Sequence, residues 1–387
     1  MKIIIIGGHL SPALSVLDSL PKDWEILFFG RKYVFEGEKS LSLEYKTINN
    51  LPAGKAGLKI PFEEILTGRL QRKFTKNTIP SLLKLPSGFF KAFIVLRKFK
   101  PDVVLGFGGY PQVPVVFASF FLKIPVVLHE QTLEAGLANK ICTPIAEKIC
   151  ISWKSSANFF PKRKTILTGN PIRKDIIQSS GFPGLDNRSG AGRVRSSGLD
   201  LPLIYVTGGS SGSHFLNSLI ENLIQELLVN FKIIHQTGDS REYKDYERLY
   251  NLYKKLPKKL RDNYSLYKFI DAQEVGRILN KAEFAIARSG INTVTEFIFT
   301  KKPAILIPLP FSQNNEQLKN ALFLKKLGLG RMILQKEATP QVLLSNIQSM
   351  HKSINEYKKN LKNLKDLIKE DAADKIIKVV KQCVLEK

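Results

Sequence analysis

The chain has 387 residues, of which 43% are hydrophobic and 24% charged, and its formal net charge is +25. Length and composition are those of a soluble globular protein with two domains, each able to bury its own core. The charge indicates an anionic partner: nucleic acid, a phosphorylated substrate or an anionic membrane surface. Three cysteines, Cys142, Cys150 and Cys383, follow no paired pattern, which argues against structural zinc and for a reducing compartment.

The N-terminal residues predict the start of a parallel α/β domain. Residues 2–6 form the first expected strand, Gly7-Gly8-His9 the loop after it, and a helix follows. The first apolar run is too short for a signal peptide, and the most apolar region, residues 113–128, is too interrupted to span a membrane, so we expect a cytoplasmic protein. His9 lies at the carboxyl end of a strand, where such sheets bind ligands. It is either a general base or a helix-capping or solvated histidine.

A change in composition follows the next expected strands, residues 25–29 and 43–48. Between residues 55 and 100 the chain has eleven Lys or Arg but only two Glu, and leucine and phenylalanine are interleaved with the basic residues. Such a pattern is typical of a surface that rests on anionic lipid without crossing it. The alternative is a core helix with Phe89 and Phe93 buried and lysines on its wet face.

Polar and glycine-rich segments follow two further strands of this half. Residues 102–105 lead into Gly106-Phe107-Gly108-Gly109-Tyr110, which is not the dinucleotide-binding GxGxxG motif. Residues 124–128 lead into His129-Glu130-Gln131-Thr132. This placement is typical of a ligand site, although any one of these residues could instead cap a helix beginning near Glu134. Residues 148–151 and 165–167 are the last expected strands.

A second doubly wound pattern begins after a glycine- and serine-rich segment, residues 179–201, which reads as flexible linker. Its expected strands are residues 203–206, 232–235, 268–271, 284–287 and 304–307. A glycine-rich loop, residues 207–212, follows the first of these strands. The sequence therefore predicts two Rossmann-like domains facing each other across a cleft, with domain limits 1–173 and 203–354, a linker at 174–202 and a helical tail at 355–387.

The stretch around Gly290 has the features of a nucleotide-diphosphate site. Gly290 follows a buried strand and precedes a helix, whose free N–H groups would point at a bound anion. Glu296 lies six residues further on, about 9 Å along the helix axis, where its carboxylate can accept from both ribose hydroxyls. The alternative is an ordinary strand–helix–strand unit with a surface glutamate.

Several motifs occur in one order: GGH, LGFGGY, PVVLHEQ with AGLANK, GNPIR, VTGGSSG, FID, and RSGINTVTE followed by NNEQLKNA. This ordered set resembles glycosyltransferase family 28, the N-acetylglucosaminyltransferases of peptidoglycan synthesis. The resemblance covers nearly the whole chain outside residues 35–100 and 174–202. It departs from the family at the first loop, usually GGTGGH, at Thr132, usually asparagine, and at Glu316, usually glutamine.

The resemblance implies a GT-B enzyme that transfers N-acetylglucosamine, with inversion, from UDP-N-acetylglucosamine to the muramoyl 4-hydroxyl of undecaprenyl-diphospho-muramoylpentapeptide. His9 is the first candidate for the base and Glu130 the second, while Tyr110, His129 and Gln131 lie on the acceptor side. The donor contacts implied by the resemblance are Gly7, Gly8, Thr132, Arg173, Ser210, Asn217, Ile270, Ile291, Asn292, Thr293, Val294, Thr295, Glu296 and Gln317. Backbone amides at Gly208 and Gly209 and the helix start near Ile291 would stabilise the leaving diphosphate without a bound metal. No cofactor is implied.

Other functions remain open at this point. A UDP-sugar 2-epimerase, or a transferase with another acceptor, would share Glu296 and the helix start. A non-catalytic protein would bind the UDP-sugar without turnover. No recognised nucleic-acid-binding module occurs in this sequence, which argues against nucleic-acid binding. The missing GxGxxG motif argues against a dinucleotide-dependent dehydrogenase. The expected partners are therefore the UDP-sugar, the lipid-linked acceptor and the anionic cytoplasmic face of the membrane, not nucleic acid.

Overall fold

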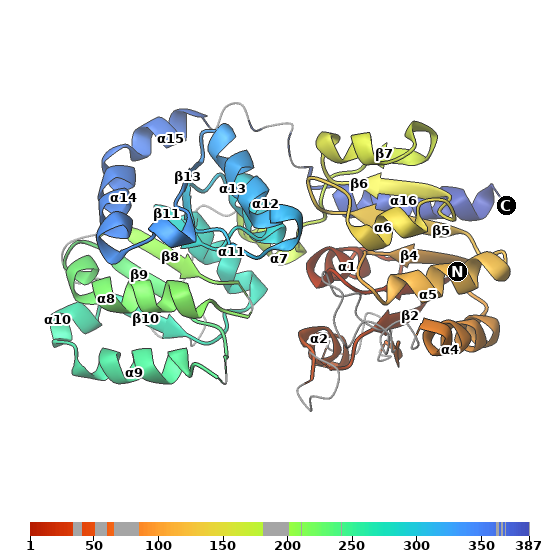
Figure 1. Ribbon diagram of the computed structural model, residues 1–387, viewed down its shortest axis with the longest axis horizontal. Helices are drawn as coiled ribbons and strands as arrows, with labels where there is room; N and C mark the ends of the chain where they lie inside the picture. The colour runs from red at the N-terminus through yellow and green to blue at the C-terminus, as the bar shows by residue number, and fades with distance from the viewer. Residues whose placement is uncertain are drawn as a thin grey trace. The chain divides into compact units, whose positions relative to one another are not determined.

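The computed structural model describes residues 1–33, 41–50, 60–65, 85–180, 201–209, 211–240, 242–360, 364, 367 and 369–386. The chain divides into two compact units (Figure 1). Unit 1 comprises Met1–Arg173 and Lys369–Lys387, and unit 2 comprises Lys174–Ile368. Each unit is a parallel sheet with helices on both faces, the doubly wound α/β architecture predicted for both halves.

Unit 1 contains a seven-stranded parallel sheet in the order β3-β2-β1-β4-β5-β6-β7. Its strands are β1 (Lys2–Ile6), β2 (Glu25–Gly30), β3 (Phe62–Glu64), β4 (Val103–Gly106), β5 (Val126–Glu130), β6 (Lys148–Ile151) and β7 (Thr165–Leu167). Its described helices are α1 (Leu10–Leu17), α2 (Leu43–Asn50), α4 (Leu85–Phe99), α5 (Gln112–Phe121), α6 (Leu137–Cys142), α16 (Ala372–Leu385) and the 3-10 turns η1 (Lys154–Phe159) and η2 (Lys162–Lys164). The order reverses between β1 and β4, which makes the carboxyl ends of these two strands the expected ligand edge.

The apolar run in β1 is explained by burial on both faces. Ile3 and Ile5 pack with α1 and α16, whereas Ile4 and Ile6 pack with α4, α5 and α6 on the opposite face. All four side chains are fully buried. A strand covered on both sides reads as continuous apolar sequence, which is why its position was predictable.

The prediction of a strand at residues 43–48 is wrong, because these residues form helix α2. The Ser42 hydroxyl accepts a hydrogen bond from Tyr45 N at 3.0 Å, which caps the first turn. Glu44 and Ile48 are both buried, at i and i+4 on one helical face. The spacing of these two buried residues is that of a helix.

Unit 2 contains a six-stranded parallel sheet in the order β10-β9-β8-β11-β12-β13. Its strands are β8 (Leu203–Thr207), β9 (Lys232–Gln236), β10 (Tyr264–Tyr267), β11 (Phe284–Ala287), β12 (Ala304–Leu306) and β13 (Gly330–Met332). Its described helices are α7 (Lys174–Ser180), α8 (His214–Asn230), α9 (Asp245–Lys255), α10 (Lys258–Arg261), α11 (Ala272–Lys281), α12 (Ile291–Phe299), α13 (Glu316–Lys326), α14 (Pro340–Lys352), α15 (Ile354–Asn360) and the turns η3 (Gln313–Asn315) and η4 (Gln335–Glu337). The order reverses between β8 and β11.

Two segments differ from the expected linker and tail. Residues 174–180 form α7, which packs against α11 in unit 2, and residues 181–200 lie outside the described residues. The tail divides: α15 belongs to unit 2, whereas α16 returns to unit 1 and packs on α1, β4, β5 and β6. Ile376, Val379 and Val380 of α16 are part of the unit 1 core.

Residues 66–84, the middle of the expected lipid-facing region, lie outside the described residues. In the part of the chain that the structure describes, no helix has both the length and the apolar character needed to cross a membrane.

Candidate active site

The two glycine-rich loops of unit 1 touch each other at the carboxyl edge of the sheet. Gly8 has a φ of +149°, and a Cβ on this residue would lie 2.1 Å from the carbonyl oxygen of Gly108. Only glycine fits this close approach. The short first loop, with three residues fewer than the family's usual GGTGGH, therefore lies directly on the second loop.

His9 lies at this junction. A Cβ placed on Gly108 would come within 3.1 Å of His9 Cδ2, so the imidazole covers the second loop. Burial lowers the pKa of His9 below its usual value, although the nearby Glu130 carboxylate opposes the shift. The histidine is therefore neutral at neutral pH, the state in which it can accept a proton.

Glu130 is a fully occupied acceptor. Its Oε1 accepts from the backbone N and the hydroxyl of Thr132 at 2.9 and 2.6 Å, and its Oε2 accepts from Gly136 N and Asn139 Nδ2 at 2.8 and 2.9 Å. The residue is 1% exposed. Four donors on one buried carboxylate hold the loop from residue 130 to residue 139 in place, and we call this arrangement the Glu130 clamp. The Thr132 hydroxyl points inward to the same carboxylate.

Replacing Glu130 by alanine is expected to destabilise the protein by about 3 kcal/mol or more, because several buried donors would lose their acceptor. Urea unfolding of the two proteins measures the difference. Glu25→Ala is the matched control, since the Glu25 carboxylate is mostly exposed in its ion pair with Lys2 and such pairs contribute little. A Glu130→Ala protein as stable as Glu25→Ala would contradict the clamp.

Three supporting residues near these loops were missed by the sequence analysis. Gln112, fully buried, accepts from Gly108 N at 2.7 Å and donates to Asn139 Oδ1 at 2.8 Å, which links the second glycine loop to the Glu130 clamp. Glu44 lies directly against Gly7, where a Cβ would come within 1.7 Å of its Oε1. Burial raises the pKa of Glu44. Of these three residues, only Asn139 belongs to a motif named in the sequence analysis, AGLANK.

The remaining predicted residues of unit 1 have different surroundings. His129 is buried against the Phe107 ring, its Nε2 lies 3.2 Å from Ser152 Oγ, and burial lowers its pKa to about 3. Gln131 is 3% exposed, and its side-chain oxygen has no hydrogen-bond partner among the described residues. Tyr110 and Arg173 are both half-buried.

In unit 2, open space lies in front of two glycines that follow neighbouring strands. Gly209 comes after β8 and Gly290 caps α12 after β11, and a Cβ on either would meet no described atom within 4 Å beyond its chain neighbours. β8 and β11 flank the reversal of strand order. The carboxyl edge of this sheet therefore has room for a ligand beside the first turn of α12, whose N–H groups favour an anion.

Helix α12 divides the predicted run of donor contacts into two sets. Ile291, Val294 and Thr295 are buried against the sheet. Asn292, Thr293 and Glu296 are half-buried and share one face, because residues three and four apart are neighbours on a helix. The side chains of these three, unlike those of the buried set, reach the surface of the helix.

Asn217 is fully buried and its side chain is occupied. Its Nδ2 donates to Thr237 O and to Asp245 Oδ2 at 3.0 and 2.9 Å, and its Oδ1 lies 3.0 Å from His235 Nε2. Burial lowers the pKa of His235 to about 3, so this ring is neutral and its Nε2 is the donor to the amide. Asn217 holds the β8 and β9 loops together, an arrangement that no sequence pattern indicated.

The structure describes two of the three remaining donor residues predicted for unit 2. Ile270 lies half-buried between β10 and α11. Gln317 accepts from Leu309 N at 3.0 Å through Oε1, and its backbone oxygen accepts from Ser289 Oγ at 2.7 Å. Ser210 lies outside the described residues.

Two doubly wound parallel α/β domains with glycine loops at the carboxyl edges of their sheets are the architecture of the GT-B fold. Solved structures with this fold include Acinetobacter baumannii MurG, with a TM-score of 0.68, 23% identity and coverage of 99% of this chain and all of the other. UDP-GlcNAc 2-epimerase from Neisseria meningitidis bound to UDP-GlcNAc has a TM-score of 0.62 at 15% identity, with full coverage of both chains. Fold alone therefore does not separate transferase from epimerase.

The sequence comparison does separate them. Residues 6–151 match the glycosyltransferase family 28 N-terminal domain and residues 203–376 match its C-terminal domain, so the chain belongs to glycosyltransferase family 28. A Clostridium kluyveri protein named UDP-N-acetylglucosamine--N-acetylmuramyl-(pentapeptide) pyrophosphoryl-undecaprenol N-acetylglucosamine transferase is 31% identical, with coverage of 98% of this chain and 99% of its own length. A Bacillus cereus protein of that name, numbered 2, is 30% identical over 93% of this chain and 94% of its own.

Proposed function

We propose that this protein transfers N-acetylglucosamine from UDP-N-acetylglucosamine to the 4-hydroxyl of the muramoyl sugar in an undecaprenyl-diphosphate-linked muramoylpentapeptide. The observation that carries the proposal is identity of 31% with a transferase of that name over 98% of this chain. The open edge between Gly209 and Gly290, with Glu296 on the half-buried face of α12, supports the donor half of the reaction.

The reaction is a direct displacement with inversion. His9 takes the proton of the acceptor hydroxyl, the hydroxyl oxygen bonds to the anomeric carbon of the donor sugar, and the bond from that carbon to the diphosphate breaks. UDP then leaves. The amides of Gly208 and Gly209 and the first turn of α12 stabilise the charge that develops on the diphosphate. Glu296 holds the ribose hydroxyls, and the backbone at Ile270 holds the uracil.

His9 is a better base than Glu130 for a physical reason. A base needs a lone pair that can reach the substrate proton. All four donors of the Glu130 clamp occupy its carboxylate, whereas the burial of His9 keeps its imidazole neutral. Glu130 acts on the reaction through the loop that it shapes.

The deciding experiment is transfer of radiolabelled sugar from UDP-N-acetylglucosamine to a short-chain lipid-diphosphate muramoylpentapeptide. Labelled disaccharide-lipid supports the proposal. Release of UDP and an altered sugar without any acceptor would instead identify a 2-epimerase, the activity of the solved neighbour from Neisseria meningitidis. If the protein bound uracil nucleotides but formed neither product, the proposed acceptor would be wrong and the proposed donor site would stand.

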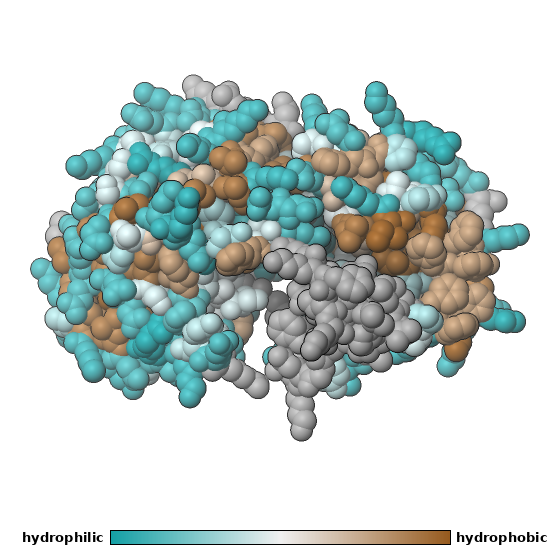
Figure 2. Space-filling model, viewed as in Figure 1, coloured by the Kyte–Doolittle hydropathy of each residue, from teal (hydrophilic) through white to brown (hydrophobic). Residues whose placement is uncertain are grey.

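The acceptor is lipid-linked, and unit 1 has an exposed apolar surface suited to the membrane. We name it the α4–α5 patch: Phe90, Ile94, Phe120 and Phe121, which are 63%, 65%, 59% and 64% exposed. The two helices pack together, with the Phe89 and Phe121 rings 5.7 Å apart. Figure 2 shows hydrophobic residues gathered over this part of unit 1, with hydrophilic residues at the edge. Lys91, Arg97, Lys98 and Lys123 come from the same two helices and the turn after α5.

Exposed apolar side chains on helices that also carry lysine and arginine suit the headgroup region of an anionic bilayer. The α4–α5 patch accordingly holds the enzyme on the cytoplasmic face of the membrane. The anionic lipid headgroups would then be the partner of part of the net charge of +25.

Ile94→Asp combined with Phe121→Asp is expected to lower the fraction bound to phosphatidylglycerol vesicles at least tenfold. The double variant loses two exposed apolar side chains that would enter the bilayer, and its two new negative charges are repelled by the anionic lipid. Vesicle sedimentation measures the bound fraction, and UDP affinity should not change. Val229→Asp, at an exposed apolar residue of α8 in unit 2, is the control. Equal loss of vesicle binding in the control variant would contradict a membrane role for the patch.

A further inference from the structure

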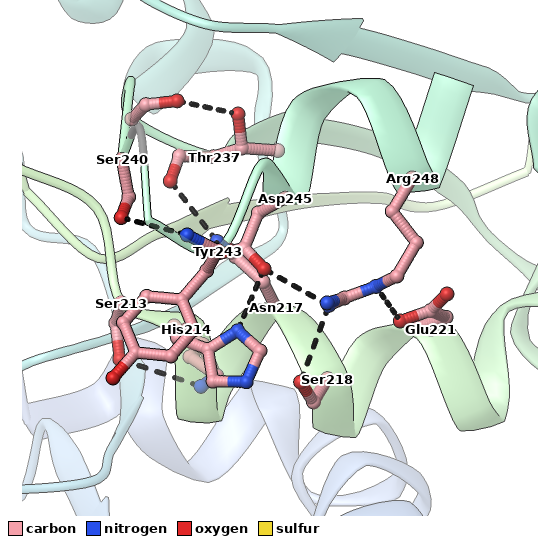
Figure 3. Close-up of polar contacts among 12 residues, drawn as sticks. Ser213, His214, Asn217, Ser218, Glu221, Thr237, Ser240, Tyr243, Asp245 and Arg248 are labelled. Atoms are coloured by element: carbon pink, nitrogen blue, oxygen red, sulfur yellow. Dashed lines mark hydrogen bonds and ion pairs between the residues drawn. The ribbon is translucent and has the colours of Figure 1, made fainter. Parts of the chain in front are cut away.

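Asp245 is a buried carboxylate that ties the start of α9 to the start of α8 (Figure 3). Its Oδ1 accepts from His214 Nδ1 at 2.7 Å and from Arg248 Nη2 at 2.9 Å, and its Oδ2 accepts from Asn217 Nδ2 at 2.9 Å. Its side chain is 2% exposed. Arg248 already neutralises the carboxylate and Asn217 already satisfies its second oxygen. His214 is therefore not needed to satisfy Asp245.

The pairing instead fixes the imidazole of His214. A carboxylate can only accept, so the bonded Nδ1 carries a proton. One ring face stacks on Tyr243, with centroids 4.0 Å apart and an interplanar angle of 13°. The side chain is 38% exposed, and its Nε2 has no hydrogen-bond partner among the described residues. The ring is thus held in one orientation with one nitrogen left for a ligand.

The position of His214 relates it to the diphosphate loop. It is the first residue of α8, and only the N-cap Ser213 separates it from the glycine-rich loop after β8. Gly212, at a φ of +74°, packs so closely on the β9 loop that a Cβ would lie 2.0 Å from Thr237 O, whereas Gly209 of the same loop faces open space. Tyr243 and Asp245, which orient the imidazole, come from the segment that follows β9. The fixed ring and the open glycine therefore belong to one carboxyl edge, beside the reversal of strand order.

From this arrangement we propose that His214 is a donor-binding residue. With a second proton on the ring, in addition to the one that Nδ1 shares with Asp245, its Nε2 donates a hydrogen bond to the diphosphate of the nucleotide sugar. Asp245 orients the ring from behind, as carboxylates do for histidines that bind metals, and Tyr243 fixes its plane. Hydrogen bonds to a phosphate oxygen are among the stronger ones in proteins. The inference rests on the proposed function, because it requires the diphosphate to lie at the β8 loop.

Two substitutions separate this role from a structural one. In His214→Asn the amide nitrogen lies near the position of Nδ1, so the bond to Asp245 is kept and Nε2 is lost. In His214→Gln the amide nitrogen lies near the position of Nε2, so the ligand contact is kept and the Asp245 bond is lost. Isothermal titration with UDP and with uridine, on the full chain, measures the two affinities for each variant, and thermal melting checks folding.

The expected result is that His214→Asn lowers UDP affinity about tenfold and leaves uridine affinity unchanged, while His214→Gln loses about threefold or less for UDP. The reverse order would overturn the proposal and make His214 a support for Asp245 alone. An equal loss of affinity for UDP and for uridine would overturn it as well, since removing a contact to the diphosphate cannot weaken binding of uridine, which has no diphosphate. If the wild-type protein bound neither ligand, the proposed function itself would fail, and this inference with it.

Discussion

Replacing His9 by alanine is expected to lower the rate of sugar transfer by about 10²–10⁴-fold, the usual contribution of a positioned general base. UDP affinity should stay within about twofold, because the base acts on the acceptor hydroxyl. The measurement is radiolabel transfer to the short-chain lipid acceptor at saturating concentrations of both substrates. His351→Ala is the matched control, since that histidine pairs with Glu283 in unit 2, outside the proposed site.

The pH dependence of the same reaction tests the assignment further. Burial lowers the pKa of His9, so the neutral base persists below the ordinary histidine pKa of about 6.5, and activity falls only as pH drops through the lowered value. His9→Ala should remove this acidic limb. Folding stability follows the same sign: the unfolded chain protonates His9 more readily, so this residue favours unfolding as pH falls below about 6.5. A His9→Ala enzyme with normal turnover would remove His9 from the mechanism.

Replacing Glu296 by alanine is expected to weaken binding of UDP-N-acetylglucosamine about 30- to 150-fold, the equivalent of about 2–3 kcal/mol for hydrogen bonds from the ribose hydroxyls to a carboxylate. Glu296 lies on the half-buried face of α12 with Asn292 and Thr293, along the helix that begins at the open glycine Gly290. Isothermal titration measures the affinity. Glu226→Ala, on an exposed position of α8, is the control.

A modified ligand makes this prediction specific to the ribose. The wild-type protein should bind 2′-deoxy-UDP more weakly than UDP, because one hydroxyl contact is absent. Glu296→Ala should bind the two ligands about equally, since it lacks the partner of that hydroxyl. If the variant still preferred UDP as strongly as the wild type does, the ribose would have a different partner.

The fold was predictable where burial leaves a direct trace in the sequence. Strands covered on both faces, such as β1 and β11, read as short apolar runs, and Gly290 marks the start of α12. Helix α2 was not predictable in this way, because its identity depends on the cap at Ser42 and on burial of Glu44 against Gly7. The Ser42 cap is a local signal, three residues before Tyr45, that the sequence analysis overlooked. The contact between Glu44 and Gly7 joins distant parts of the chain, which the local sequence does not reveal.

The site was predictable in its position but less so in its chemistry. Motif residues collect at the carboxyl edges of both sheets, as the order of strands requires. What each residue does depends on tertiary partners: Glu130 and Asn217 have their hydrogen-bonding groups occupied by protein, and Gln112 supports a loop from outside any motif. His214 has no counterpart in the sequence argument, since its partner Asp245 lies 31 positions away.

The return of α16 to unit 1 has a consequence for synthesis on the ribosome. The unit 1 core includes Ile376, Val379 and Val380, which are translated after the whole of unit 2. Domains usually fold in the order in which they emerge. Here the nascent chain completes unit 2 while the sheet face that α16 covers, including Ile3 and Ile5, still lacks that helix. Until the last turns emerge, this apolar face stays uncovered, and we expect a chain stalled before residue 372 to be more susceptible to proteolysis.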